Sequence, residues 1–137
     1  MSQRAGNWFL MAAVAGMLAA CTSSKDTPVD PNLFPTNYKQ EILGTLTRTL
    51  GDPTNVREAY ISDPALGPVD KEQRYIVCVR YNARDGGLHY EGSTDHIAYF
   101  YGGHLNQLIN ASKEQCGTAA YKPFPELEKL CQAAKCA

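Results

Sequence analysis

The sequence predicts an α+β domain in which an N-terminal helix packs on a three- or four-stranded antiparallel meander, followed by a short disulfide-pinned C-terminal helix. Three observations predict this class. Apolar residues recur with helical spacing over 36–50, strand-like segments separated by turn residues fill 56–110, and a short helical pattern that begins at Pro125 contains Cys131, with Cys136 close by. Elements grouped in this way, rather than alternating strand and helix, favour α+β.

The chain begins with a leader. A polar start carrying Arg4 precedes an apolar run over 8–18, which as a helix is about 16 Å long at 1.5 Å per residue. A membrane span needs roughly 20 apolar residues, so this run is typical of a signal peptide. Leu18-Ala19-Ala20-Cys21 resembles the lipobox of bacterial lipoproteins. The resemblance implies that residues 1–20 are removed and that a lipid on Cys21 binds the membrane.

The alternative is an ordinary secretory leader cut after Ala20, which leaves Cys21 as an odd thiol. Thr22 follows the cysteine, whereas Asp at this position retains enteric lipoproteins in the inner membrane. The resemblance therefore implies an outer-membrane protein, with its domain facing the periplasm. Residues 21–35 contain three prolines and no apolar periodicity, so we interpret them as a lipidated flexible tether. A single α+β domain over 36–137 follows.

The size and charge of the chain limit its partners. Its 137 residues carry a formal net charge of −1, and the chain after the leader has the size of one ordinary domain. No basic block is present, so nucleic-acid binding has no electrostatic support.

Four cysteines remain besides Cys21: Cys78, Cys116, Cys131 and Cys136. An even number in an oxidising compartment predicts two disulfides, and three pairings are open. No pair has Cys-x-x-Cys spacing, which disfavours a metal site. Because Cys131 and Cys136 are close enough for a local bridge, we favour that pair together with Cys78–Cys116.

Residues 36–50 have the clearest helical pattern. Thr36 or Asn37 offers an N-cap, and Gly51 is placed at the expected end. The apolar stripe repeats every four residues, at Tyr38, Ile42, Leu46 and Leu50. We expect this stripe to pack on the sheet of the same domain. The alternative is a helix that binds a partner.

The strand-like segments come next along the chain. We expect strands over 56–62, 74–82, 94–101 and 104–110, with the second one central because both of its faces are apolar. Prolines and glycine indicate a loop over 63–70. The polar stretch 83–92 indicates a turn or a protruding hairpin loop, and Gly102-Gly103 indicates a two-residue hairpin turn.

Residues 50–56 read Leu-Gly-Asp-Pro-Thr-Asn-Val, and the third strand ends in Phe100-Tyr101-Gly102-Gly103. This order of helix, turn, strands and Phe–Gly hairpin is loosely similar to the small lipoprotein of the outer-membrane barrel-assembly machinery. That family has two helices before its sheet and lacks the element around Cys131 and Cys136. The resemblance implies an analogous fold, and function does not follow from fold.

No catalytic set converges in the sequence. His89 and His104 fall at turns on opposite ends of a shared strand, which disfavours a metal site formed with His96. Ser93, Asp95 and His96 are close in sequence, but neighbouring side chains on a strand alternate faces. We therefore expect no enzyme activity, no metal and no cofactor.

Tyrosines and arginines concentrate on the predicted strands. We expect partner-binding residues on the sheet face away from the helix, at Tyr75, Arg80, Tyr81, Tyr99 and Tyr101. These residue types are enriched at interface hot spots. The alternative is cross-strand packing with the hydroxyls in water. The expected function is a lipid-anchored, non-enzymatic envelope protein that binds a protein partner as an assembly subunit. The alternative is an inhibitor of a secreted hydrolase such as lysozyme, with loop 83–92 in the enzyme's cleft.

Overall fold

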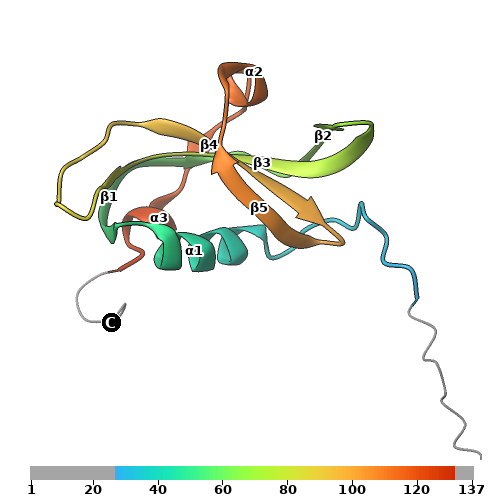
Figure 1. The fold of residues 1–137 in the computed structure, drawn as a ribbon, viewed down its shortest axis with the longest axis horizontal. Helices are drawn as coiled ribbons and strands as arrows, with labels where there is room; N and C mark the ends of the chain where they lie inside the picture. The colour runs from blue at the N-terminus through green and yellow to red at the C-terminus, as the bar shows by residue number, and fades with distance from the viewer. Residues whose placement is uncertain (1–26, 132–137) are drawn as a thin grey trace, which may run out of the picture.

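The computed structural model describes residues 27–131. The predicted signal peptide, Cys21 and Cys136 lie outside the described residues. In chain order the elements are α1 (Tyr38–Thr49), β1 (Asp52–Ile61), β2 (Ala65–Val69), β3 (Glu72–Arg84), β4 (Thr94–Tyr101), β5 (His104–Asn110), α2 (Lys113–Cys116), β6 (Lys122–Pro123) and α3 (Pro125–Glu128) (Figure 1).

The strands form one six-stranded antiparallel sheet. Its order is β5-β4-β3-β1-β6, and β2 also pairs with β3. β1 and β2 follow one another along the same edge of β3, since Ile61 pairs with Val79 and Ala65 pairs with Ile76. The backbone N–H of Ser62 donates to the carbonyl of Cys78 at 2.9 Å in the interruption between them. β1, β2 and β3 therefore make one long hairpin, with β3 at the centre of the molecule.

The predicted three- or four-stranded meander under one N-terminal helix is wrong: the described residues form six strands and three small helices. Pro64, Gly67 and Pro68 indicated a loop, but β2 forms there. Proline is tolerated in an edge strand because its missing N–H need not enter a ladder, and β2 pairs with β3 alone. β6, at Lys122–Pro123, is too short to produce a strand pattern in the sequence.

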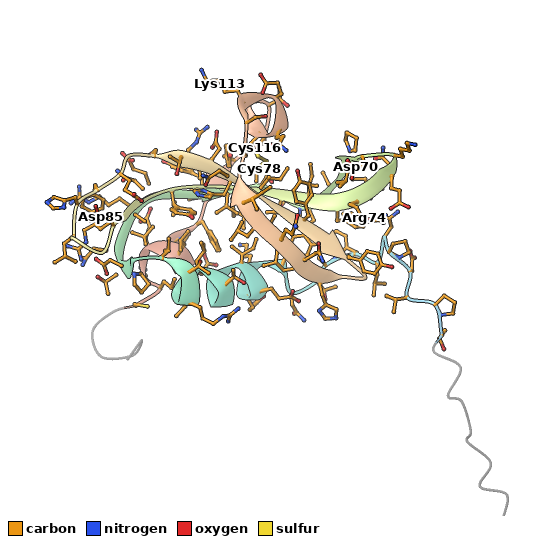
Figure 2. All side chains as sticks on the ribbon, in the orientation of Figure 1. Asp70, Arg74, Cys78, Asp85, Lys113 and Cys116 are labelled. Carbon is orange, nitrogen blue, oxygen red and sulfur yellow. A yellow bond between two sulfur atoms is a disulfide. The ribbon has the colours of Figure 1, made fainter. Side chains whose placement is uncertain are left out.

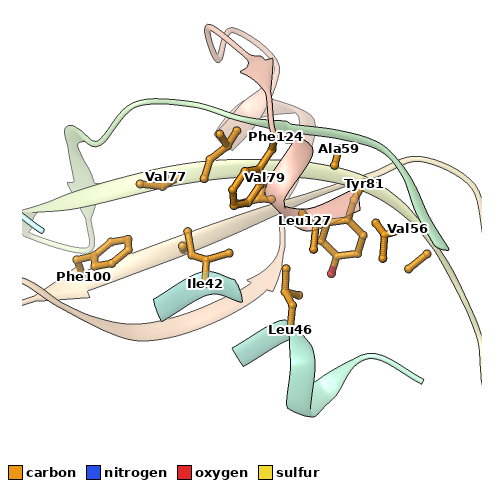
Figure 3. Close-up of a cluster of buried hydrophobic side chains, with 13 residues drawn as sticks. Ile42, Leu46, Val56, Ala59, Val77, Val79, Tyr81, Phe100, Phe124 and Leu127 are labelled. Atoms are coloured by element: carbon orange, nitrogen blue, oxygen red, sulfur yellow. The ribbon is translucent and has the colours of Figure 1, made fainter. Parts of the chain in front are cut away.

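The main core lies on the sheet face that α1 and α3 cover, which we name the helix face (Figure 3). Ile42 and Leu46, on the apolar stripe of α1, are fully buried there. Alternate residues of β3 point the same way, because successive side chains of a strand alternate faces. The buried members of this core are Ile42, Leu46, Val56, Ala59, Ile61, Val77, Val79, Tyr81, Ala83, Ala98, Phe100, Phe124 and Leu127.

We name the opposite sheet face the outer face, and α2 stands on it (Figure 1). A disulfide between Cys78 of β3 and Cys116 of α2 joins them, with a Cα–Cα distance of 5.8 Å. Both cysteines and Ile97 form a small second core. The predicted Cys78–Cys116 pair is confirmed, and it holds α2 on the outer face. The predicted Cys131–Cys136 pair stays a prediction.

The turn between β4 and β5 receives residues 29–34, which we name the strap. Gly102 and Gly103 form this turn with φ of 59° and 81°, a left-handed backbone that glycine adopts without strain. The N–H of Gly102 donates to the carbonyl of Pro31 at 3.1 Å. Part of the predicted tether thus lies on the domain. Within residues 27–131, no helix is long and apolar enough to cross a membrane.

Candidate binding face

The five predicted partner-binding residues divide between the two faces of the sheet. Arg80 lies on the outer face, whereas Tyr75 and Tyr81 lie on the helix face, because each is an odd number of residues from Arg80 on the same strand. Tyr99 and Tyr101, an even number apart on β4, share the outer face with Arg80. Three of the five residues therefore share the outer face, and Tyr75 and Tyr81 lie on the opposite face; their role in partner binding stays a prediction.

Tyr81 is 6 % exposed and belongs to the core. Its ring stacks on that of His96 at a centroid distance of 4.3 Å, and its hydroxyl lies 3.1 Å from Nε2 of His96. Burial raises the pKa of Tyr81 to about 12. Tyr75 meets the ring of Phe34 edge-on at 5.2 Å. Both tyrosines therefore serve packing within the chain.

Arg80 is the centre of a cluster on the outer face that also contains Tyr60, Asp95 and Tyr121, which we name the Arg80 cluster. Nε and Nη2 of Arg80 donate to the two carboxylate oxygens of Asp95, at 2.8 and 3.2 Å. The hydroxyl of Tyr121 donates to Asp95 at 2.8 Å. The guanidinium also lies 4.6 Å from the centre of the Tyr121 ring. The register of β1 on β3 places Tyr60 directly opposite Arg80.

Hydrogen bonds within the Arg80 cluster stabilise the charged forms of Arg80 and Asp95. The hydrogen bond from Arg80 lowers the pKa of Asp95, and burial opposes that shift. Burial raises the pKa of Tyr121, and the hydrogen bond to Asp95 raises it further. The side chain of Arg80 remains 41 % exposed. The cluster thus presents a fixed, charged guanidinium between two tyrosines, with Tyr60 itself 40 % exposed.

Three further arginine–tyrosine contacts lie on the outer face, one toward the start of β3 and two toward its end. The guanidinium of Arg74 lies 5.2 Å from the ring centre of Tyr101. At the other end, Arg57 lies 3.6 Å from the ring centre of Tyr90, and Arg84 lies 5.9 Å from it. Cations over aromatic faces are attracted to the ring quadrupole. The outer face therefore carries a row of such contacts along β3.

The loop between β3 and β4 protrudes at one end of the molecule, as predicted for residues 83–92 (Figure 2, near Asp85). Its conformation is fixed locally, because the carboxylate of Asp85 accepts hydrogen bonds from the N–H groups of Gly87 and His89 at 2.8 and 3.0 Å. Leu88 has a φ of 64° and is 61 % exposed. The loop thus displays an apolar side chain at a structured tip.

Ser93, Asp95 and His96, which are close in sequence, each have a different partner in the structure. Ser93 donates its hydroxyl hydrogen bond to Glu58, Asp95 binds Arg80, and His96 packs on Tyr81 on the other side of the sheet. Among residues 27–131, no group of three His, Cys, Asp or Glu side chains is placed to hold a metal ion.

Three members of the Arg80 cluster are absent from the predicted partner-binding residues: Tyr60, Asp95 and Tyr121. Asp95 lies opposite Arg80 in the β3–β4 register. Aligning the two predicted strands as a hairpin around the loop between them would have predicted this pair. Tyr121 lies in a segment without a periodic pattern. The predicted Cys78–Cys116 disulfide was the available signal, because it brings the residues after Cys116 next to β3.

Comparisons with protein-family models, with curated proteins and with solved structures find no match to this chain.

Proposed function

We propose that this chain is a lipid-anchored, non-enzymatic protein of the outer membrane that binds a protein partner through its outer face and serves as an assembly or scaffolding subunit. The proposed lipid is on Cys21, and the domain faces the periplasm. The observation that carries the binding proposal is the Arg80 cluster, an exposed guanidinium fixed between tyrosines on a sheet face that the main core does not use.

The geometry of the cluster favours binding. Arg80 is held by two hydrogen bonds to Asp95, so little side-chain freedom remains to be lost when a partner docks. Tyr60 adds a large, rigid aromatic surface beside it. Arginine and tyrosine are the residue types most enriched among hot spots, which cluster at the centres of interfaces.

The test is in-cell crosslinking, followed by purification through a C-terminal tag and mass spectrometry. We expect one envelope protein to be recovered with the wild-type chain and lost with Arg80→Ala and with Tyr60→Ala. Arg48→Ala is the matched control, because Arg48 lies on the exposed side of α1. Thermal unfolding of each variant separates loss of binding from loss of folding.

Recovery of the same partner with folded Arg80→Ala and Tyr60→Ala variants would contradict binding through the outer face. Recovery of bulk porins alone, from the wild type and from every variant, would contradict a stable complex altogether.

A second candidate function is inhibition of a secreted hydrolase such as lysozyme. The observation that favours it is the structured loop with Leu88 at its tip, because a pre-ordered loop loses little conformational entropy on entering a cleft. We expect inhibition by the purified chain to be lost with Leu88→Asp and kept with Arg80→Ala. The reverse pattern, or no inhibition by the wild type, contradicts this candidate.

A further inference from the structure

Exposed apolar side chains gather at the end of the molecule where the strap crosses the β4–β5 turn. Val29, Leu33 and Phe34 of the strap are each about half exposed, as is Tyr101 at the end of β4. Leu66 pairs with Tyr75, whose ring contacts Phe34, and is 53 % exposed. We name these five side chains, of Val29, Leu33, Phe34, Leu66 and Tyr101, the apolar end. Soluble surfaces rarely gather large apolar side chains in this way without a binding role.

The strap is seated on the turn by close contacts. A Cβ atom on Gly102 would lie 2.5 Å from Cγ1 of Val29, and one on Gly103 would lie 3.3 Å from the side chain of Leu33. A side chain at Gly102 would displace Val29, and one at Gly103 would crowd Leu33. The N–H of Asn32 donates to the carboxylate of Asp30 at 2.9 Å and gives the strap its own turn. The apolar side chains therefore have fixed positions relative to the sheet.

The position of the strap in the chain identifies what covers the apolar end. Val29 is eight residues after Cys21, and eight residues span at most about 28 Å when fully extended. A lipid on Cys21 would therefore keep the start of the strap within about 28 Å of the point of attachment. Such a short tether gives an effective concentration in the millimolar range, so even a weak surface contact is populated.

We propose that the apolar end seats on the surface of the lipid bilayer and so fixes the orientation of the domain. This inference rests on the proposed lipidation of Cys21. Phe34, Tyr101 and the aliphatic side chains of the strap have the amphipathic and apolar character that favours the boundary between headgroups and acyl chains.

The charges at this end indicate that the contact is apolar rather than electrostatic. Arg74 pairs with Glu72, and Asp70 and Lys71 follow one another in the adjacent turn between β2 and β3 (Figure 2). Positive and negative groups are thus balanced. We therefore expect the seating to persist in uncharged vesicles and at high salt, where attraction to anionic headgroups would be screened.

The test uses tryptophan fluorescence in the lipidated full chain. Trp8, in the leader, is the one tryptophan of the sequence, so a single introduced tryptophan reports its own site once the leader is removed. Leu33→Trp and Val29→Trp place it at the apolar end. Leu88→Trp is the matched control, because Leu88 is equally exposed at the opposite end of the molecule. Each variant is reconstituted into phosphatidylcholine vesicles with brominated acyl chains, with and without added phosphatidylglycerol.

We expect bromine to quench most of the emission of Leu33→Trp and Val29→Trp in both vesicle types, and to leave that of Leu88→Trp unchanged. Two variants are used so that one failed fold does not decide the result. Vesicle-bound protein whose strap tryptophans are unquenched would overturn the seating, whether the apolar end then faces water or a protein. Quenching of Leu88→Trp instead would overturn the orientation. Protein that fails to float with the vesicles would overturn the lipidation on which the proposal rests, a result distinct from both.

Discussion

The fold opposes a positive charge on His96. Its ring stacks on buried Tyr81, and a cavity of about 240 Å³ between Leu50, Ala83 and Asn110 adjoins both rings. Burial lowers the pKa of His96, while a backbone hydrogen bond at Thr94 and the carboxylate of Asp95 act in the opposite direction. The neutral imidazole is therefore the form that the native packing accepts.

This environment predicts a pH dependence of stability. In the unfolded chain His96 gains a proton near pH 6.5, whereas in the folded chain it does so at lower pH. The unfolded state thus binds more protons below neutral pH, and the free energy of unfolding falls as pH drops from about 7 toward 5. We expect His96→Gln to reduce this slope in urea titrations.

The carboxylates act in a different pH window. Hydrogen bonds from Thr54 lower the pKa of Asp52, as those from Arg80 lower that of Asp95. The stability that they contribute is present above the unfolded pKa, near 4, and is lost below it. An unchanged slope between pH 7 and 5 in His96→Gln would therefore assign the dependence to groups other than His96.

At the scale of elements, α2 depends on its disulfide more than on its own four residues. Isolated helices of this length are unstable in water. Ser112 caps the helix through a reciprocal pair of hydrogen bonds with Gln115, and Gln115 also donates to the hydroxyl of Tyr99 at 2.8 Å. The Cys78–Cys116 bond holds this unit, and the segment leading to Tyr121, on the outer face.

We therefore expect Cys78→Ala with Cys116→Ala to lower the free energy of unfolding by roughly 3–4 kcal/mol, the loop entropy of a crosslink of this span. Ser112→Ala, with the disulfide intact, is expected to cost about 1 kcal/mol, the usual value for a lost N-cap. Urea unfolding measures both. A double variant no less stable than Ser112→Ala would show that packing alone holds α2 in place.

Elements with strong side-chain periodicity were predicted correctly from the sequence. Elements that exist only because they pair with another strand were not. The stripe from Ile42 to Leu46 and the Gly102-Gly103 turn are local patterns, and both stand where they were predicted. β2 was missed because Pro64 before it and Pro68 within it indicated a loop, and no local signal shows that a strand lies at the edge of a sheet. Part of the candidate site could have been predicted, because strand alternation alone puts Tyr81 and Arg80 on opposite faces of the sheet. Tyr121 could not be placed from a local pattern, because the distant Cys78–Cys116 crosslink determines its position.

At the scale of the whole molecule, the sheet pairs strands that are far apart in sequence. β6 adds to β1 by pairing Pro123 with Tyr60 and Lys122 with Ile61, so the last strand meets the first. Contacts between residues far apart in sequence slow folding, because chain entropy is lost before they form. We expect the oxidised chain to refold in milliseconds to seconds, measured by stopped-flow dilution from urea. Refolding within microseconds would contradict this view of the topology.

β3 determines how far apart the two ends of the molecule stand. Its 13 residues extend roughly 43 Å at about 3.3 Å per residue. The apolar end lies near its start and the Leu88 loop near its finish (Figure 2). If the strap rests on lipid, this single strand is a spacer about as long as a bilayer is thick, headgroups included. A partner bound by the loop is then held at a set distance from the membrane surface under the strap. Lengthening or shortening β3 would change that distance.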